Sequence, residues 1–460
     1  MNKVKFNYDY SRILWMKMFL AKPDFENNCS QVLITFEQAL EIIKGIDNIT
    51  QGIEKIIYLV GWQGLGHDDC YPEMEVINPY LKRECDATAK ESLLWLIAEA
   101  KKHNTVISYH GNVADAYKAS PSHEEFVKEA AILRNADGTP AVIEVFNGRD
   151  AFKTSYKQYW ESGLFKKIFD AFCEAVPVKE AGTVHLDNFC IAENFCPRAD
   201  FEAQNEARNK MIDYVQSLGI DVTSEYTYRE HPLRADAVYH PVTKYYKNFV
   251  NNIEPKSWEE SPLHTLGRIP AVWWMSNMTI DDCINIQPEQ FSGYLNDAVL
   301  KTVFYGTMHG EDIWMNNGND KDVWVPLFIK EFCTHHVPYI YLNRYKRLSY
   351  IKDEDNYIAA FSDGVESAGK TKTITKNKTV LKNGNDVILP LTEDNRIFIA
   401  YSEKGRSGEW NVPDAVFEKA KVYNITADGN EYISEITVTD KKIHLDLKAG
   451  QAVAIKDISI

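Results

Sequence analysis

Short, continuous apolar runs alternate with longer helical patterns through the first three-quarters of the chain. Such runs are typical of strands buried on both faces, and intervening helices are typical of crossovers in a parallel sheet. The strand-like runs are residues 13–20, 56–62, 106–110, 184–189, 222–226, 271–275, 303–308 and 339–342. The helix-like segments include residues 36–43, 90–102, 165–175 and 203–218. Eight strands with helical crossovers predict an α/β fold of the (β/α)8 TIM-barrel type.

The pattern changes after about Tyr350, where the apolar stretches become short and rich in β-branched residues. These stretches are residues 357–361, 370–375, 379–381, 387–389, 396–401, 420–425, 433–439, 443–447 and 452–455. Turn dipeptides of the Asn-Gly, Asp-Gly and Ala-Gly types begin at Asn383, Asp428 and Ala449. Short strands joined by such turns indicate antiparallel pairing. We therefore predict a barrel over residues 1–348 and a C-terminal antiparallel β-sandwich over residues 349–460.

The charge balance narrows the class of partner. The chain has 51 Lys and Arg against 66 Asp and Glu, a net charge of -15. A surface of this sign repels nucleic acid and anionic membranes, so neither is an expected partner, whereas a neutral sugar is compatible with it. The 8 Cys are scattered, which favours buried free thiols over a disulfide framework. With no long apolar run, the expected location is the cytoplasm, and secretion after removal of a signal peptide is the alternative.

Polar side chains follow the predicted barrel strands at the points where these strands end. Because the carboxyl ends of barrel strands form the active-site face, these residues are candidates for chemistry. The candidates, taken strand by strand, are Trp62, Gln63, His67 and Asp68; His110 and Asn112; Asp187 and Asn188; Glu225; and Trp273 and Trp274.

Two of these candidates are carboxylates at consecutive strand ends. Asp187 follows a buried run, and Glu225 lies 38 positions later, after the next strand. Neighbouring strands lie about 4.8 Å apart, so the two carboxyls could be about 5 Å apart, as in a retaining glycosidase. One carboxylate would attack the anomeric carbon and the other would protonate the leaving oxygen. A salt bridge or a loop cap is the structural alternative for each residue.

The other candidates have a binding interpretation and a structural one. His67 and Asp68 follow a Gly-rich turn and either hydrogen bond sugar hydroxyls or cap the loop. Trp62, Trp273 and Trp274 either stack on a sugar ring or fill the core. No spaced His pair, Cys cluster or calcium loop occurs, so we expect no metal and no cofactor.

The segment with Gly61, Trp62 and Gln63, then Gly66, His67 and Asp68, then Tyr71 and Pro72, resembles the substrate-binding motif of glycoside hydrolase family 101, the endo-α-N-acetylgalactosaminidases. The related family 129 α-N-acetylgalactosaminidases share its layout. The order of the following segments, from His110 and Asn112 to Asp187 and Glu225, is similar too. Residues 408–413 and 422–426 resemble the sandwich that follows these barrels.

The resemblance implies roles for four residues. Asp187 would be the nucleophile, Glu225 the acid/base, and His67 and Asp68 would hold hydroxyls of the sugar in the cleaving subsite. Family 101 enzymes are large, secreted, multidomain proteins, whereas this chain is predicted to be barrel plus sandwich. The interval from Asp187 to Glu225 is also somewhat longer than in that family. An exo-acting enzyme of the family 129 kind is therefore the better hypothesis.

The resulting prediction is a retaining α-glycosidase that cleaves α-linked N-acetylgalactosamine or galactose from glycans or glycopeptides through a covalent glycosyl-enzyme. One alternative is a metal-dependent hydrolase on the same barrel, using His67, Asp68 and His110. The other is a carbohydrate-binding protein without catalysis. The sequence does not specify the oligomeric state.

Overall fold

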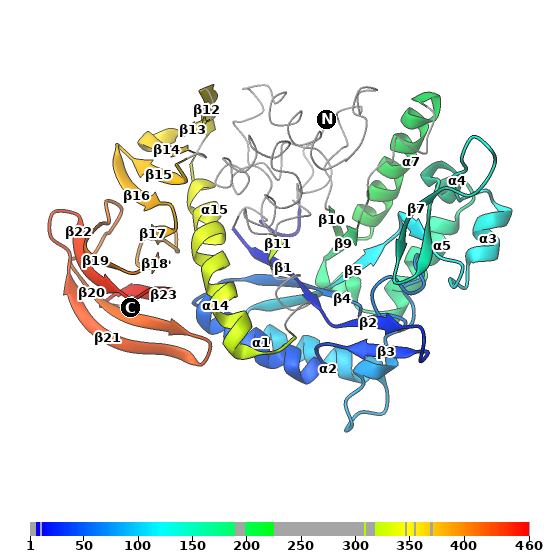
Figure 1. The fold of residues 1–460 in the computed structure, drawn as a ribbon, viewed down its shortest axis with the longest axis horizontal. Helices are drawn as coiled ribbons and strands as arrows, with labels where there is room; N and C mark the ends of the chain where they lie inside the picture. Colours follow the sequence, from blue (N-terminus) through cyan, green and yellow to red (C-terminus); the bar gives the residue numbers. More distant parts are fainter. Residues whose placement is uncertain are drawn as a thin grey trace.

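The computed structural model describes residues 6–9, 12–187, 189, 198–224, 308–309, 318–345, 347–353, 356–368 and 371–459. Within these residues, a parallel sheet lies beside a larger antiparallel sheet near the C-terminus, and helices α14 (Lys321–Glu331) and α15 (Val337–Leu342) lie between the two (Figure 1). The predicted α/β class is confirmed.

The parallel sheet has the strand order β10-β9-β5-β4-β1-β11 in the described part of the chain. Its strands are β1 (Leu14–Phe19), β4 (Lys55–Val60), β5 (Thr105–Asn112), β9 (Thr183–Asp187), β10 (Asp221–Ser224) and β11 (Met308–His309). The crossover helices are α1 (Phe36–Ile49), α2 (Ala89–Lys101), α5 (Leu164–Ala175), α6 (Val178–Ala181) and α7 (Arg198–Ser217). The first five predicted strands and the four predicted helices are found at their expected places. The predicted strand 271–275 lies outside the described residues.

Smaller antiparallel elements are inserted after the parallel strands. The hairpin of β2 (Ala21–Asp24) and β3 (Cys29–Val32) follows β1. A three-stranded sheet of β6 (Asp115–Ala116), β8 (Arg149–Lys153) and β7 (Val142–Phe146) follows β5. Short helices α3 (His123–Lys128), α4 (Tyr156–Glu161) and the 3-10 turn η1 (Pro79–Leu81) complete these connections. The insertions leave the carboxyl ends of the parallel strands, so they surround the face where candidate residues were predicted.

The parallel sheet has two buried faces of different chemistry. Met18, Leu59 and Ile46 belong to one apolar cluster, so the outer face packs on α1. Alternate residues of a strand point to opposite faces, which places the next residues along each strand on the inner face. That face buries polar side chains from several strands: Lys17, Tyr58, Ser108, His110, Asn112, Thr183, His185 and Thr223.

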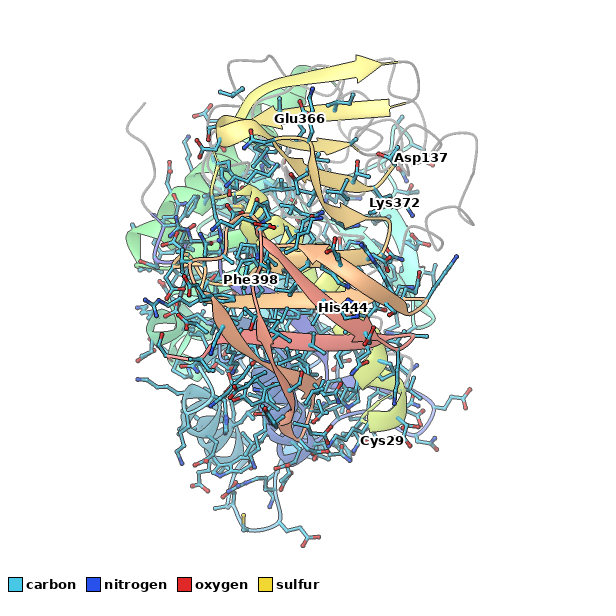
Figure 2. All side chains as sticks on the ribbon, turned by 90° about the vertical axis from the view of Figure 1, so that its left-hand side faces the viewer. Cys29, Asp137, Glu366, Lys372, Phe398 and His444 are labelled. Atoms are coloured by element: carbon cyan, nitrogen blue, oxygen red, sulfur yellow. The ribbon has the colours of Figure 1, made fainter. Side chains whose placement is uncertain are left out.

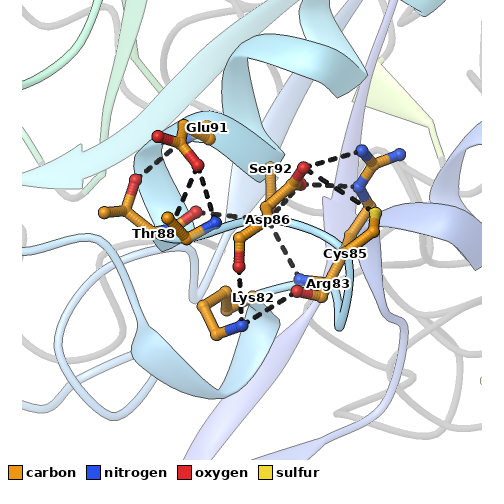
Figure 3. Close-up of polar contacts among 8 residues, drawn as sticks. Lys82, Arg83, Cys85, Asp86, Thr88, Glu91 and Ser92 are labelled. Atoms are coloured by element: carbon orange, nitrogen blue, oxygen red, sulfur yellow. Dashed lines mark hydrogen bonds and ion pairs between the residues drawn. The ribbon is translucent and has the colours of Figure 1, made fainter.

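Helix α2 begins at a capping box, drawn in Figure 3. The Thr88 side chain accepts a hydrogen bond from the Glu91 backbone N–H, and the Glu91 carboxylate accepts from the Thr88 N–H. Just before the helix, Asp86 accepts hydrogen bonds from Arg83 and Ser92, which lower the Asp86 pKa to about 2. These contacts fix the end of the long connection between β4 and α2.

The predicted eighth strand, residues 339–342, is wrong. Those residues belong to α15, which continues α14 through the π-helical turn η4 (Phe332–His336). All six residues of α15 are buried, so the segment shows no polar face to the solvent. A short, uniformly apolar run has the same appearance in a buried strand and in a buried helix.

The C-terminal part is an antiparallel sandwich. Its larger sheet has the order β12-β13-β14-β15-β16-β17-β18-β23-β20-β21, and β19 pairs with β22 as a second layer. Apolar side chains that include Phe398 lie between these layers; Figure 2 views this part and labels Phe398. The strands are β12 (Arg347–Asp353), β13 (Asn356–Phe361), β14 (Val365–Ala368), β15 (Thr373–Lys376), β16 (Thr379–Asn383), β17 (Asp386–Pro390), β18 (Ile397–Ser402), β19 (Arg406–Asn411), β20 (Lys419–Thr426), β21 (Gly429–Thr437), β22 (Lys442–Leu447) and β23 (Gln451–Asp457).

The sandwich packs directly on the helical layer of the parallel sheet. A Cβ atom on Gly45 of α1 would lie 3.0 Å from Trp324 of α14 and 3.2 Å from Ala427. The Asn48 side chain donates a hydrogen bond to the Ala427 carbonyl oxygen at 2.8 Å. Glycine at position 45 thus permits the close contact between α1, α14 and the turn after β20.

Candidate active site

The candidate site lies where β5 and β9 end at the carboxyl edge of the parallel sheet. The register pairs His110 with His185, and Asn112 with Asp187. His110, Asn112, Asp187, His67 and Asp68 form what we call the mouth. Two of its members, His110 and Asn112, are fully buried, and the Asp187 side chain is 18% exposed. The Asp187 carboxylate therefore reaches solvent, whereas His110 and Asn112 do not.

Asp187 lies beside a histidine that is held neutral. The His110 Nε2 atom is 3.7 Å from the Asp187 Oδ2 atom. Burial is the main cause that places the pKa of His110 well below its ordinary value, and the positive charge of Lys17 adds to the effect. An uncharged imidazole does not place a positive charge beside the Asp187 carboxylate.

Further imidazoles extend from the mouth into the inner face. The His110 ring centroid lies 5.1 Å from that of His67 and 5.3 Å from that of His185. His185 Nδ1 hydrogen bonds the Thr223 hydroxyl at 2.9 Å. Burial, followed by the charge of Lys17, places the His185 pKa well below its ordinary value. Burial, with a smaller contribution from the charge of Lys17, thus keeps both histidines neutral.

The loop of residues 61–69 brings His67 and Asp68 to the mouth. A Cβ on Gly61 would lie 1.9 Å from the Ala21 carbonyl oxygen, so only glycine allows this close approach to β2. The His67 N–H donates to the same Ala21 oxygen at 3.0 Å. His67 Nε2 is 3.3 Å from Asp68 Oδ2. The Gly-rich pattern in the sequence therefore reflects a loop that is folded tightly against the β2–β3 hairpin.

Three of the predicted binding residues, Trp62, Asn112 and Gln63, form contacts within the protein. Trp62 is buried between Tyr109 and Phe172, and its indole N–H donates to the His110 carbonyl oxygen at 2.9 Å. The structure thus places the Trp62 ring in the apolar core.

The other two residues, Asn112 and Gln63, carry amide side chains; the Asn112 side chain has partners, and Gln63 is paired through its backbone. Asn112 donates to the Asp115 carboxylate at 2.7 Å and accepts from the Ala114 and Asp115 N–H groups. Gln63 is also buried, and its backbone forms a bridge with Ile77. Asn112 therefore shapes the turn that follows β5, whatever else it contacts.

Sequence reasoning missed Tyr71, Tyr117 and Lys17. Both tyrosines are buried; burial and then the charge of Asp68 raise the pKa of each hydroxyl. The Tyr71 hydroxyl lies 3.5 Å from His67 Nδ1. Tyr71 was part of the family motif, and Lys17 was the single charge in an apolar run, so a sequence signal existed for both. Tyr117 gave none.

The predicted residues Asn188, Glu225, Trp273 and Trp274 lie outside the described residues. Strand β10 is described as far as Ser224, which pairs with Leu186. Among the described residues, no three His, Cys, Asp or Glu side chains gather as metal ligands would. No helix in the described part of the chain is long and apolar enough to span a membrane.

Comparison with known proteins finds a family model that matches part of this chain. Residues 21–240 match the family model of glycoside hydrolase family 101, described as endo-alpha-N-acetylgalactosaminidase. The resemblance that the motifs indicated is therefore confirmed over a stretch that contains loop 61–69 and Asp187. No curated protein matches the chain.

Three solved structures of similar architecture are distant from this chain in sequence. The alpha-N-acetylgalactosaminidase NagBb from Bifidobacterium bifidum is 14% identical, with a TM-score of 0.49 over 80% of this chain and 57% of that one. The chain thus spans little more than half of that protein. A maltogenic alpha-amylase, AmyB from Thermotoga neapolitana, is 10% identical with a TM-score of 0.41, over 97% of this chain and 98% of that one. An alpha-amylase from Geobacillus thermoleovorans is 11% identical with a TM-score of 0.41, over 98% and 99%.

Proposed function

We propose that this chain is a retaining α-glycosidase that releases α-linked N-acetylgalactosamine or galactose from glycans or glycopeptides. The observation that carries the proposal is the position of Asp187. Its partly exposed carboxylate ends β9 beside the neutral His110, in the mouth that also contains Asp68. The family match includes all three residues.

The proposed architecture is a closed (β/α)8 barrel over residues 1–348 with an accessory sandwich over residues 349–460. The pairing of β11 with β1 supports closure, because a strand late in the chain returns to the first strand. In a closed barrel the first and last strands are neighbours.

In the proposed reaction, Asp187 attacks the anomeric carbon while Glu225 protonates the leaving oxygen. Water then attacks the covalent glycosyl-enzyme with Glu225 as base, and the configuration is retained. Glu225 directly follows Ser224 in the sequence, and Ser224 pairs with Leu186, the residue before Asp187. Carboxyls at adjacent strand ends suit the separation of about 5 Å that this mechanism needs.

The proposed sugar contacts come from His67 and Asp68. A carboxylate accepts hydrogen bonds from two neighbouring hydroxyls, and an imidazole donates or accepts one. The neutral His110 would donate to a hydroxyl without placing a positive charge beside the nucleophile. Asn188, Trp273 and Trp274 remain proposed contacts from the sequence.

A panel of p-nitrophenyl α- and β-glycosides tests the reaction class. We expect cleavage of an α-N-acetylgalactosaminide or α-galactoside, with an α-configured first product by NMR. Asp187→Ala should lower turnover by about 10⁴-fold, and azide should restore it as a β-glycosyl azide. Asp137→Asn, an exposed carboxylate seen in Figure 2, is the control and should keep full activity.

Three results would contradict the proposal. An Asp187→Ala variant with near-normal activity on each glycoside that the wild type cleaves would remove the nucleophile. Activity lost to a chelator and restored by a metal ion would favour the metal-dependent hydrolase. Sugar binding without turnover across the panel would leave only a carbohydrate-binding protein.

A further inference from the structure

The backbone of loop 61–69 is held in conformations that it would not keep alone. Gly64 and Gly66 have φ angles of +56° and +137°, and Asp68 has a φ angle of +61°. A left-handed conformation at a residue other than glycine costs about 1 kcal/mol or more and persists where its surroundings enforce it. The surroundings of Asp68 are therefore part of the site.

Asp69 braces the loop from within. Its Oδ2 atom accepts a hydrogen bond from the Leu65 N–H at 2.9 Å. A Cβ on Gly64 would lie 2.7 Å from the same Oδ2 atom, so the carboxylate fills the space beneath the turn. Asp69 is itself only 8% exposed, and its orientation depends on what holds its other oxygen.

Arg149 holds that other oxygen. Its Nη1 atom donates to Asp69 Oδ1 at 3.2 Å and to the Asp69 carbonyl oxygen at 3.3 Å. The guanidinium carbon lies 3.3 Å from the centroid of the Phe25 ring, in the turn between β2 and β3. The planar guanidinium thus touches two segments that are distant in sequence from its own strand.

A second contact from the same hairpin reaches the loop directly. The Asn147 side-chain amide, in the turn between β7 and β8, donates to the His67 carbonyl oxygen at 3.3 Å. From the opposite side, the His67 N–H donates to Ala21 of β2. The peptide groups on both sides of His67 are therefore held by two different hairpins.

We propose that the β7–β8 hairpin is a clamp on loop 61–69 and that Arg149 is a positioning residue that acts through Asp69 to hold His67 and Asp68 in their sugar-binding arrangement. The inference rests on the proposed function, because it assigns the clamp to the same site. Lysine cannot replace Arg149, since an ammonium neither stacks flat on Phe25 nor presents a planar fork of donors.

The test compares Arg149→Ala and Arg149→Lys with Arg134→Ala, an exposed arginine that donates to the Gly138 carbonyl oxygen. Hydrogen exchange of the Leu65 amide should become about tenfold faster in both Arg149 variants, and remain unchanged in the control. On the cleaved glycoside, KM should rise about tenfold, with a much smaller change in kcat, because binding of the sugar hydroxyls is impaired. Guanidinium ion should partly restore KM in Arg149→Ala.

The other possible outcomes of these measurements would each contradict part of the inference. Unchanged exchange at Leu65 with an unchanged KM would show that the hairpin is not a clamp. A raised KM with unchanged exchange would mean that Arg149 touches the substrate itself. Faster exchange with an unchanged KM would separate the clamp from sugar binding. A wild-type protein that cleaves no glycoside would refute the proposed function, while the exchange measurement would still test the clamp.

If Arg149→Ala fails to fold, Asn147→Ala provides the second variant. It removes the contact to His67 and leaves the pair of Arg149 and Asp69 in place. A smaller rise in KM, about two- to threefold, is then expected. An unchanged KM and unchanged exchange at His67 in that variant would count against the clamp.

Discussion

The inner face of the parallel sheet and the interior of the C-terminal sandwich are both closed to solvent, but they bury different groups. The sandwich interior holds Phe398, Val422, Ile455 and similar apolar side chains. The inner face of the sheet holds imidazoles, hydroxyls, an amide and the Lys17 ammonium. Apolar burial stabilises a fold, whereas burial of polar groups costs free energy unless each is paired. The sandwich interior therefore contributes to stability, whereas the polar groups of the inner face supply candidates for chemistry.

Only some polar groups of the inner face hydrogen bond to one another. His185 and Thr223 satisfy each other, as do Tyr58 and Thr183 through their hydroxyls at 2.7 Å. His110, by contrast, has no hydrogen bond from either ring nitrogen among the described residues. A buried imidazole left in this state next to a partly exposed carboxylate suits a ligand that supplies the missing partner.

Among the variants that test this contrast, Phe398→Ala should have the largest effect on the free energy of unfolding. The ring is 1% exposed and packs against Phe417 at 5.8 Å between centroids. Its loss should lower the free energy of unfolding by about 3–5 kcal/mol, without changing kcat/KM of the folded protein. Tyr432→Ala, at a 58% exposed aromatic on the same sheet, should cost about 1 kcal/mol or less. Chemical denaturation measures both, and equal losses would contradict the assignment of stability to the interior.

Asp68→Asn should do the reverse of Phe398→Ala, because it should lower kcat/KM and leave stability nearly unchanged. Asparagine also accepts a left-handed backbone, so the φ angle of +61° can be kept. The loss of a charged acceptor should lower kcat/KM about 10- to 100-fold while the midpoint of unfolding stays within about 2 °C. Asp137→Asn is again the control. A fall in stability with unchanged kcat/KM would make Asp68 a loop cap only.

A further expected effect concerns pH. His110 and His185 have lowered pKa values in the folded protein, so at mildly acidic pH the unfolded chain binds protons that the folded chain does not. The free energy of unfolding therefore keeps its full value above the unfolded-state histidine pKa of about 6.5. Below that pH it falls by about 1.4 kcal/mol per histidine per pH unit. Urea denaturation at pH 7.5 and 5.5 measures this slope.

A double variant, His110→Gln with His185→Gln, should flatten that slope. His444→Gln should leave it unchanged, because the His444 side chain is 65% exposed. A double variant with the wild-type slope would mean that other groups cause the loss of stability in acid.

The features that could be predicted from the sequence are those that depend on the residue pattern of a single segment. Asp187 could be placed because the apolar run before it forms β9, and its end marks the carboxyl edge of the sheet. Residues 339–342 were misassigned because their packing against other elements, and not their own pattern, selects a helix. Strand β14 was missed because it has only four residues, and strand β19 because most of its residues are partly or fully exposed.

The parts of the site that escaped prediction depend on contacts between distant segments. Arg149 meets Asp69 across 80 positions, with no pattern linking the two. Lys17 looked like an interruption of an apolar strand, and its effect on His110 and His185 exists only once the four strands from β1 to β9 lie side by side. Trp62 looked like a stacking platform, yet its ring faces the helical layer, a direction that its strand position alone does not specify.

The contact of Gly45 with Trp324 and Ala427 has a consequence for thermal unfolding of the protein. Residues from α1, α14 and the larger sheet of the sandwich, such as Ile46, Phe328 and Leu389, belong to one continuous apolar cluster. Neither part can therefore melt without exposing the core of the other, and calorimetry should record a single cooperative transition. Thermal inactivation of the mouth and loss of the distant sandwich then become one event, so stabilising the sandwich also extends the working life of the site.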